Sequence, residues 1–139
     1  MDRRQFIALS GTAGIIALPG IARADDAFPG PEQAAAAMKN LVFTAQDPGH
    51  WKAVKSLHVP LTKIRQGVLT ITTPHPMTEP HYIVSHTVVL EGGKFLSRKT
   101  FNWHDKPISE HRLPAGYAGK VYVTSTCNLH DFWFKEISV

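Results

Sequence analysis

YIVSHTVVLEGGKFLSRKTFNW, residues Tyr82–Trp103, carries the clearest structural signal in this sequence of 139 residues. Its first part, Tyr82–Leu90, is apolar at nearly every even position, which predicts a strand with one buried face. Glu91–Lys94 contains two glycines and predicts a tight turn, and Phe95–Trp103 predicts the returning strand. The stretch therefore predicts a β-hairpin within an antiparallel sheet.

Further strands are predicted on both sides of this hairpin. Gly67–Thr73 and Lys120–Cys127 are rich in β-branched residues, and Phe132–Val139 ends the chain as a last strand. The segment 31–40 predicts a short helix, because Pro31 opens it and strong helix formers follow. Several short strands with little helix predict an all-β fold, an antiparallel β-sandwich with a short N-terminal helix.

The first 24 residues, MDRRQFIALSGTAGIIALPGIARA, predict export rather than a part of the fold. A basic start, a weakly apolar run and the small-x-small sequence Ala22–Ala24 are typical of a cleaved signal peptide. Arg3 and Arg4, followed by Phe6, resemble a twin-arginine signal, which serves proteins that are exported already folded. We therefore expect a bacterial protein located in the periplasm.

Three segments follow from these patterns: a signal peptide at 1–24, an extension with a short helix at 25–50, and one domain at 51–139. The whole chain carries a net charge of +4, of which the predicted signal holds +2, so +2 remains. The lysines are scattered, and no basic run exceeds two residues. We therefore expect no nucleic-acid partner, and no membrane insertion after signal removal.

Five residues stand in contexts typical of metal ligands. His75 and His81 bracket a loop stiffened by two prolines, which can present two ligands with little entropy loss. Cys127, the only cysteine, stands three residues before His130, so a thiolate and an imidazole can chelate one ion from a turn. His58, just before Val59-Pro60, is the fifth candidate. Together they predict one metal site.

The other four histidines have different expected roles. His86 lies inside the predicted strand among apolar neighbours, and we expect it to be a core or inter-sheet residue. His104 and His111 stand beside acidic residues in predicted loops, and we expect both to be solvated at the surface. For His50, next to a tryptophan, the sequence favours a structural role.

The order and spacing of the candidate ligands resemble the iron-binding domain of the superoxide reductases, the desulfoferrodoxin and neelaredoxin family. The resemblance runs from about Trp51 to the C-terminus through the motifs H-V-P, H-P-M-x-x-x-H-Y-I and C-N-L-H. It implies a seven-stranded immunoglobulin-like sandwich. It also implies one ferrous ion with an axial thiolate from Cys127 and four equatorial imidazoles, from His58, His75, His81 and His130.

The same resemblance implies a function, the one-electron reduction of superoxide to hydrogen peroxide at an open sixth coordination position. A soft thiolate opposite an open position suits redox chemistry better than a closed structural zinc site. Because the chain has one cysteine, it lacks the small four-cysteine rubredoxin-like domain of some members, and a separate electron-donor protein is expected. The alternative is a copper-binding or electron-transfer protein on the same scaffold, without superoxide reductase activity.

Two departures from the family pattern concern the surroundings of the metal. Where the family usually has Glu-Lys before its first histidine, this chain has Ser56-Leu57, so a carboxylate ligand and a nearby positive charge are missing. Lys55 is the candidate that remains for steering anions. Asp131 stands where the family usually has glycine, and can alter the hydrogen bonding of the cysteine sulfur. We therefore expect a slower reductase, or a site turned to another use.

Overall fold

The computed structural model describes residues 38–139, and every structural statement below refers to this part of the chain. The predicted signal at 1–24 and most of the predicted helix at 31–40 lie outside the described residues. Residues 38–41 form a turn. No helix in the described range is both long and apolar enough to cross a membrane.

Short strands and tight connections make up the described chain. The strands are β1 (Val42–Phe43), β2 (Leu61–Arg65), β3 (Val68–Thr72), β4 (Ile83–Leu90), β5 (Lys94–Thr100), β6 (Ile108–Arg112), β7 (Lys120–Cys127) and β8 (Phe132–Ser138). A 3-10 helix, Gly49–Val54, leads into one α-helical turn, α2 (Lys55–His58). A second 3-10 turn, Glu91–Gly93, joins β4 to β5 at the predicted hairpin.

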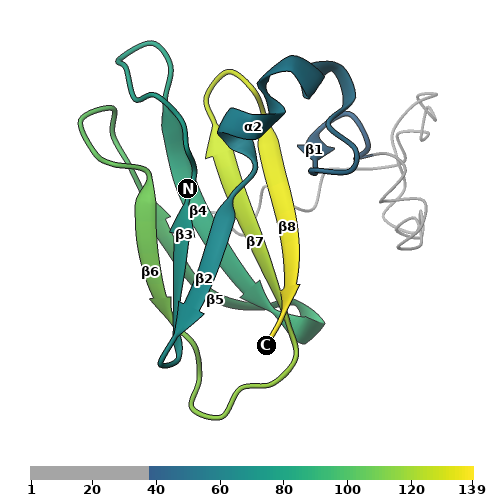
Figure 1. Cartoon of the computed structure of the whole chain (residues 1–139), viewed down its shortest axis with the longest axis vertical. Helices are drawn as coiled ribbons and strands as arrows, with labels where there is room; N and C mark the ends of the chain where they lie inside the picture. The colour runs from purple at the N-terminus through teal and green to yellow at the C-terminus, as the bar shows by residue number, and fades with distance from the viewer. Residues whose placement is uncertain (1–37) are drawn as a thin grey trace, which may run out of the picture. The chain divides into compact units, whose positions relative to one another are not determined.

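These strands form a sandwich of two sheets (Figure 1), one ordered β1-β8-β7-β4-β5 and the other β2-β3-β6. All neighbouring strands run antiparallel except β1, which pairs parallel to β8. The predicted all-β sandwich is confirmed, with eight strands in the described residues where about seven were expected.

Strands β2 and β6 were not predicted, and their composition explains why. Leu61–Arg65 lies at a sheet edge and leaves four of its five residues exposed, including apolar ones. Ile108–Arg112 alternates exposed and buried positions, but the buried ones are Ser109 and His111. Neither segment therefore shows the apolar alternation by which strands are recognised.

Residues before position 51 also pack on the sandwich. Phe43, in β1, is fully buried and its ring lies 5.7 Å from that of Trp133. Gly49 has φ of +49°, and a Cβ there would lie 2.8 Å from the Phe43 ring, so only glycine fits without a shift. The boundary at residue 51 stays a prediction, while this contact ties the preceding strand to β8.

The core between the sheets has an apolar cluster and, near one end, a smaller cluster around Cys127. The apolar cluster consists of Leu69, Ile71, Val88, Leu90, Leu113, Val121 and Val123. The smaller cluster joins Cys127 to Ile83 and Phe101, with Met77 packed against it. In β7 every second residue faces inward, and this alternation carries Cys127 into the interior.

A β-bulge in β4 turns Ile83 toward the cysteine. Ile83 pairs with Cys127 and Ser85 pairs with Thr126, so Val84 is an extra residue in this strand. We expected the even-numbered residues of this strand to be buried. This expectation is confirmed from position 86 onward but is wrong before it, because position 83 is buried and position 84 is only partly buried.

A chain of hydrogen-bonded polar side chains links the two sheets through the core. His86 Nε2 lies 2.9 Å from Thr73 Oγ1, and His86 Nδ1 lies 2.8 Å from Ser109 Oγ. Thr73 is bonded further to Ser125. The expected core role of His86, which is fully buried, is confirmed.

His111 extends this chain and corrects an expectation. Its Nε2 lies 2.8 Å from Ser109 Oγ and its Nδ1 lies 2.6 Å from Ser97 Oγ. Only 4% of the residue is exposed, so the predicted surface position is wrong. The cause is that its segment is a strand whose odd-numbered residues face inward, whereas His104 is exposed as expected.

Folding stability should depend on pH through His86. Burial, assisted by the nearby His111, lowers the pKa of His86 to about 4, while an unfolded chain protonates this imidazole near pH 6.5. Neutral His86 therefore contributes fully to the free energy of unfolding above about pH 6.5. This contribution, up to about 3 kcal/mol, is lost as the pH falls toward 4. Urea unfolding of metal-free protein between about pH 7.5 and 4.5 measures it.

The variant His86→Gln should show a shallower loss of stability with falling pH than the unsubstituted chain. His104→Gln, an exposed control, should leave the pH profile unchanged. Parallel pH profiles for His86→Gln and the unsubstituted chain would contradict this account of the buried histidine.

Candidate metal centre

Five side chains meet at one end of the sandwich. At this end α2 and the connection from β7 to β8 lie close together (Figure 1). The helical turn α2 contributes one of them, the connection from β3 to β4 contributes two, and the end of β7 with the following turn contributes two. One ligand atom from each lies within 4.8 Å of every other. These residues are His58, His75, His81, Cys127 and His130. The structure therefore brings the whole predicted ligand set together.

The four imidazole nitrogens have the spacing of ligands around one ion. His81 Nε2 lies 3.0 Å from both His75 Nε2 and His130 Nδ1, and His130 Nδ1 lies 2.9 Å from His58 Nε2. On the fourth side, the ring centroids of His58 and His75 are 4.6 Å apart, within the range of the other pairs. A square with edges of 3.0 Å has its centre about 2.1 Å from each corner (3.0 Å divided by √2). This equals a usual metal–imidazole distance of about 2.0–2.1 Å.

The sulfur lies farther from these nitrogens than they lie from one another. Cys127 Sγ is 3.6 Å from His130 Nδ1 and 3.9 Å from His75 Nε2. Burial raises the pKa of the Cys127 thiol, and the backbone N–H groups of Leu129 and His130 oppose this rise. In the absence of a metal the group is a protected thiol, and a bound cation would convert it to a thiolate ligand.

Three of the four imidazoles are shifted toward the neutral form, which is the form that binds metal. Burial, together with the neighbouring His58 and His81, lowers the pKa of His75 to about 4. Burial also lowers the pKa of His58 and of His130. His58 Nδ1 donates a hydrogen bond to the Val54 carbonyl over 2.8 Å, so that its Nε2 lone pair faces the other ligands. The donor set therefore fits one metal ion of intermediate softness.

Two residues outside the predicted set fix the ligand loops. Asn128 accepts a hydrogen bond from the Tyr82 amide and donates one to the Pro80 carbonyl, which ties the turn after β7 to the loop before β4. Trp133 stacks on His58 at 5.5 Å and donates its indole N–H to the His130 carbonyl. Asn128 was visible inside the C-N-L-H motif, whereas no sequence signal indicates the contacts of Trp133.

The remaining candidates lie around this group. The Lys55 ammonium donates a hydrogen bond from Nζ to the Ala45 carbonyl over 3.2 Å. Its role in steering anions toward the metal stays a prediction. Ser56 and Leu57, the residues in place of the family's Glu-Lys, are both exposed at the surface. His50 is half-exposed and lies 4.0 Å from an oxygen of Asp131.

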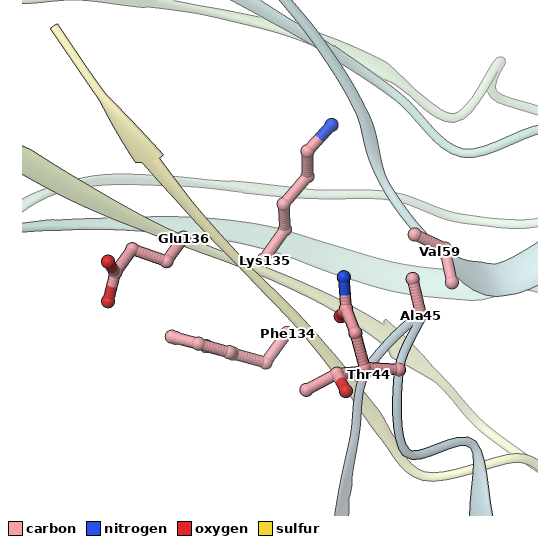
Figure 2. Close-up of a pocket in the computed structure, with 7 residues that line it drawn as sticks. Thr44, Ala45, Val59, Phe134, Lys135 and Glu136 are labelled. Atoms are coloured by element: carbon pink, nitrogen blue, oxygen red, sulfur yellow. The ribbon is translucent and has the colours of Figure 1, made fainter.

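A hollow of about 250 Å³ lies beside residues 44–46 and strand β8 (Figure 2). Val59 and Phe134 contribute apolar surface to it. Lys135 and Glu136 extend from β8 in different directions, so their charges do not converge on the hollow. None of the five candidate ligands lines it, and it is separate from the metal centre.

Comparisons with known proteins agree with this geometry. Residues 49–136 match the desulfoferrodoxin family model. The superoxide reductase of Pyrococcus horikoshii is 32% identical over 108 residues, which span 66% of this chain and 92% of that protein. The superoxide reductase of Thermococcus kodakarensis is 30% identical over the same length and shares.

Solved structures show the same fold. A superoxide reductase (neelaredoxin) from Ignicoccus hospitalis superposes with a TM-score of 0.59 at 22% identity, over 71% of this chain and 93% of that one. The reduced form of the neelaredoxin from Archaeoglobus fulgidus gives a TM-score of 0.55 at 26% identity, over 71% and 98%. With the family match extending over most of the sandwich and its ligand loops, this chain belongs to the desulfoferrodoxin family.

Proposed function

We propose that this protein is a superoxide reductase that uses one iron ion. The observation that carries the proposal is the close approach of four imidazole nitrogens, 2.9–3.0 Å apart along three edges, with a buried thiol at a greater distance from them. Relatives named superoxide reductase support it. When bound, iron would supply a one-electron redox couple and a coordination position for a small oxygen species.

The chain's own residues would prepare the site for an anion. Four neutral imidazoles add no charge and one thiolate removes one, so a divalent ion in this set would keep a net charge of about +1, which attracts superoxide. Ile83, Phe101 and Met77 cover the sulfur and protect it from oxidation. Each superoxide would take up one electron and two protons and leave as hydrogen peroxide.

We also propose that a separate donor protein returns the electron to the oxidised centre. Copper in the same ligand set remains the alternative metal, and the metal content of the native protein separates it from iron. We also propose that residues 1–24 direct export through the twin-arginine route and that the protein acts in the periplasm, as the Arg3-Arg4 pair and Ala22–Ala24 suggest.

The reduced iron protein should react with superoxide in a one-to-one ratio. Each superoxide ion consumed should oxidise one centre and form one molecule of hydrogen peroxide, without release of dioxygen. Oxidation should also produce a thiolate-to-metal absorption band that is absent from Cys127→Ser, because the band needs the sulfur ligand. Stopped-flow absorbance and peroxide assay measure both.

Two results would contradict this proposal differently. One equivalent of copper and no iron in native protein would exclude the iron centre. Iron that is bound with the thiolate band, but is not oxidised by superoxide, would exclude the reductase function while keeping the site.

Leu57→Lys should accelerate the reaction with superoxide. Leu57 directly precedes His58, and 41% of it is exposed, so a lysine there adds positive charge without disturbing the core. Steering of an anion by one such charge should raise the rate several-fold, on the order of 10-fold at low salt, and the gain should shrink as salt is added. Leu57→Gln, which is polar but uncharged, is the matched control, and an equal gain in that variant would rule out steering.

Replacement of Arg3 and Arg4 by lysine should stop export. Wild-type protein from a cell fraction enriched in periplasm should begin at Asp25, whereas the double variant should remain in the cytoplasm with residues 1–24 attached. Fractionation followed by N-terminal sequencing measures the outcome. Cytoplasmic wild-type protein that keeps its first 24 residues would refute the export proposal.

A further inference from the structure

Asp131 has an unusual backbone conformation immediately after a ligand. Its φ is +62°, a left-handed value that side chains other than glycine, asparagine and aspartate rarely adopt. Its carbonyl accepts the Cys127 amide over 3.0 Å, which closes the turn that holds Cys127 and His130. The conformation is therefore part of the turn that presents two ligands.

The Asp131 side chain points back to a segment distant in sequence. Its Oδ2 accepts a hydrogen bond from the indole N–H of Trp51 over 2.8 Å, across 80 residues of chain. The Trp51 ring in turn meets the His130 ring edge to face, with centroids 4.5 Å apart. One carboxylate thus fixes an aromatic ring against a candidate ligand.

The charge of this carboxylate has little compensation. Among the described residues, its one ion-pair contact is His50, 4.0 Å away and half-exposed. Asp131 directly follows the candidate ligand His130, and its carbonyl accepts the amide of Cys127, so its negative charge lies beside the ligand group. A negative charge near a metal favours the more oxidised, more positive state of that metal.

We propose that Asp131 is a positioning residue of the metal centre, whose carboxylate fixes Trp51 against His130 and whose charge lowers the reduction potential of the bound metal. This inference rests on the proposed function in one respect, that the metal is redox-active iron. It does not depend on a reaction with superoxide.

Three variants of the iron-loaded full chain separate the charge from the contact. Asp131→Asn removes the charge but keeps a side-chain acceptor for Trp51 and tolerates the left-handed backbone. Trp51→Phe removes the indole donor but keeps both the charge and an aromatic ring. Glu110→Gln removes an exposed carboxylate from β6, in the other sheet, and is the control for loss of one charge.

A redox titration without superoxide gives the deciding measurement. Asp131→Asn should raise the midpoint potential above that of both the wild type and Glu110→Gln, with one iron still bound. Trp51→Phe should shift the potential less, but should alter the paramagnetic resonance spectrum of the oxidised iron, because His130 loses its fixed neighbour.

An Asp131→Asn potential equal to that of the Glu110→Gln control would overturn the role of the charge. A Trp51→Phe spectrum identical to that of the wild type would overturn the positioning role. Iron protein that shows the expected shifts but does not reduce superoxide would contradict the proposed function and support this inference.

Discussion

The convergence of four imidazoles and one thiol on a single point is the constraint to which the rest of the structure is adapted. Five donor atoms lie within 4.8 Å of one another. They can do so without a bound ion only if they are uncharged, because positive imidazoles about 3 Å apart would repel one another strongly. Burial supplies this condition, since it lowers the pKa values of His58, His75 and His130 and raises that of Cys127.

The sandwich meets this constraint with ordinary strand geometry and a few local exceptions. Alternation along β7 places Cys127 inside, and a bulge in β4 turns Ile83 to cover it. Asn128 joins the two loops that carry most of the ligands. Further into the core, the hydrogen-bonded polar side chains around His86 link the two sheets. Because His86 is a titratable group, the folding stability depends on pH. Phe101, which belongs to the cluster around Cys127, meets the His86 ring edge to face at 4.9 Å and so links the ligand site to these polar side chains.

The sequence was most informative where a pattern is local. The hairpin around Gly92 and the apolar or β-branched strands lie within short windows, and these predictions are confirmed in the structure. The residues of the separate ligand motifs are brought together by the fold. It was least informative where the partners are far apart. The contact of Trp51 with Asp131 spans 80 residues, and the burial of His111 depends on a polar strand that periodicity does not reveal. Such contacts follow from the packing of the two sheets and not from any single segment.

X-ray absorption at the metal edge of the iron-loaded protein tests the central claim most directly. The spectrum should show one sulfur scatterer together with four imidazole nitrogens at about 2.1 Å, a distance compatible with the spacing of the nitrogens. The sulfur contribution should disappear when Cys127 is replaced by serine. A spectrum of the unsubstituted protein without sulfur, or with two imidazoles and otherwise oxygen ligands, would contradict the convergence of these five side chains on one ion.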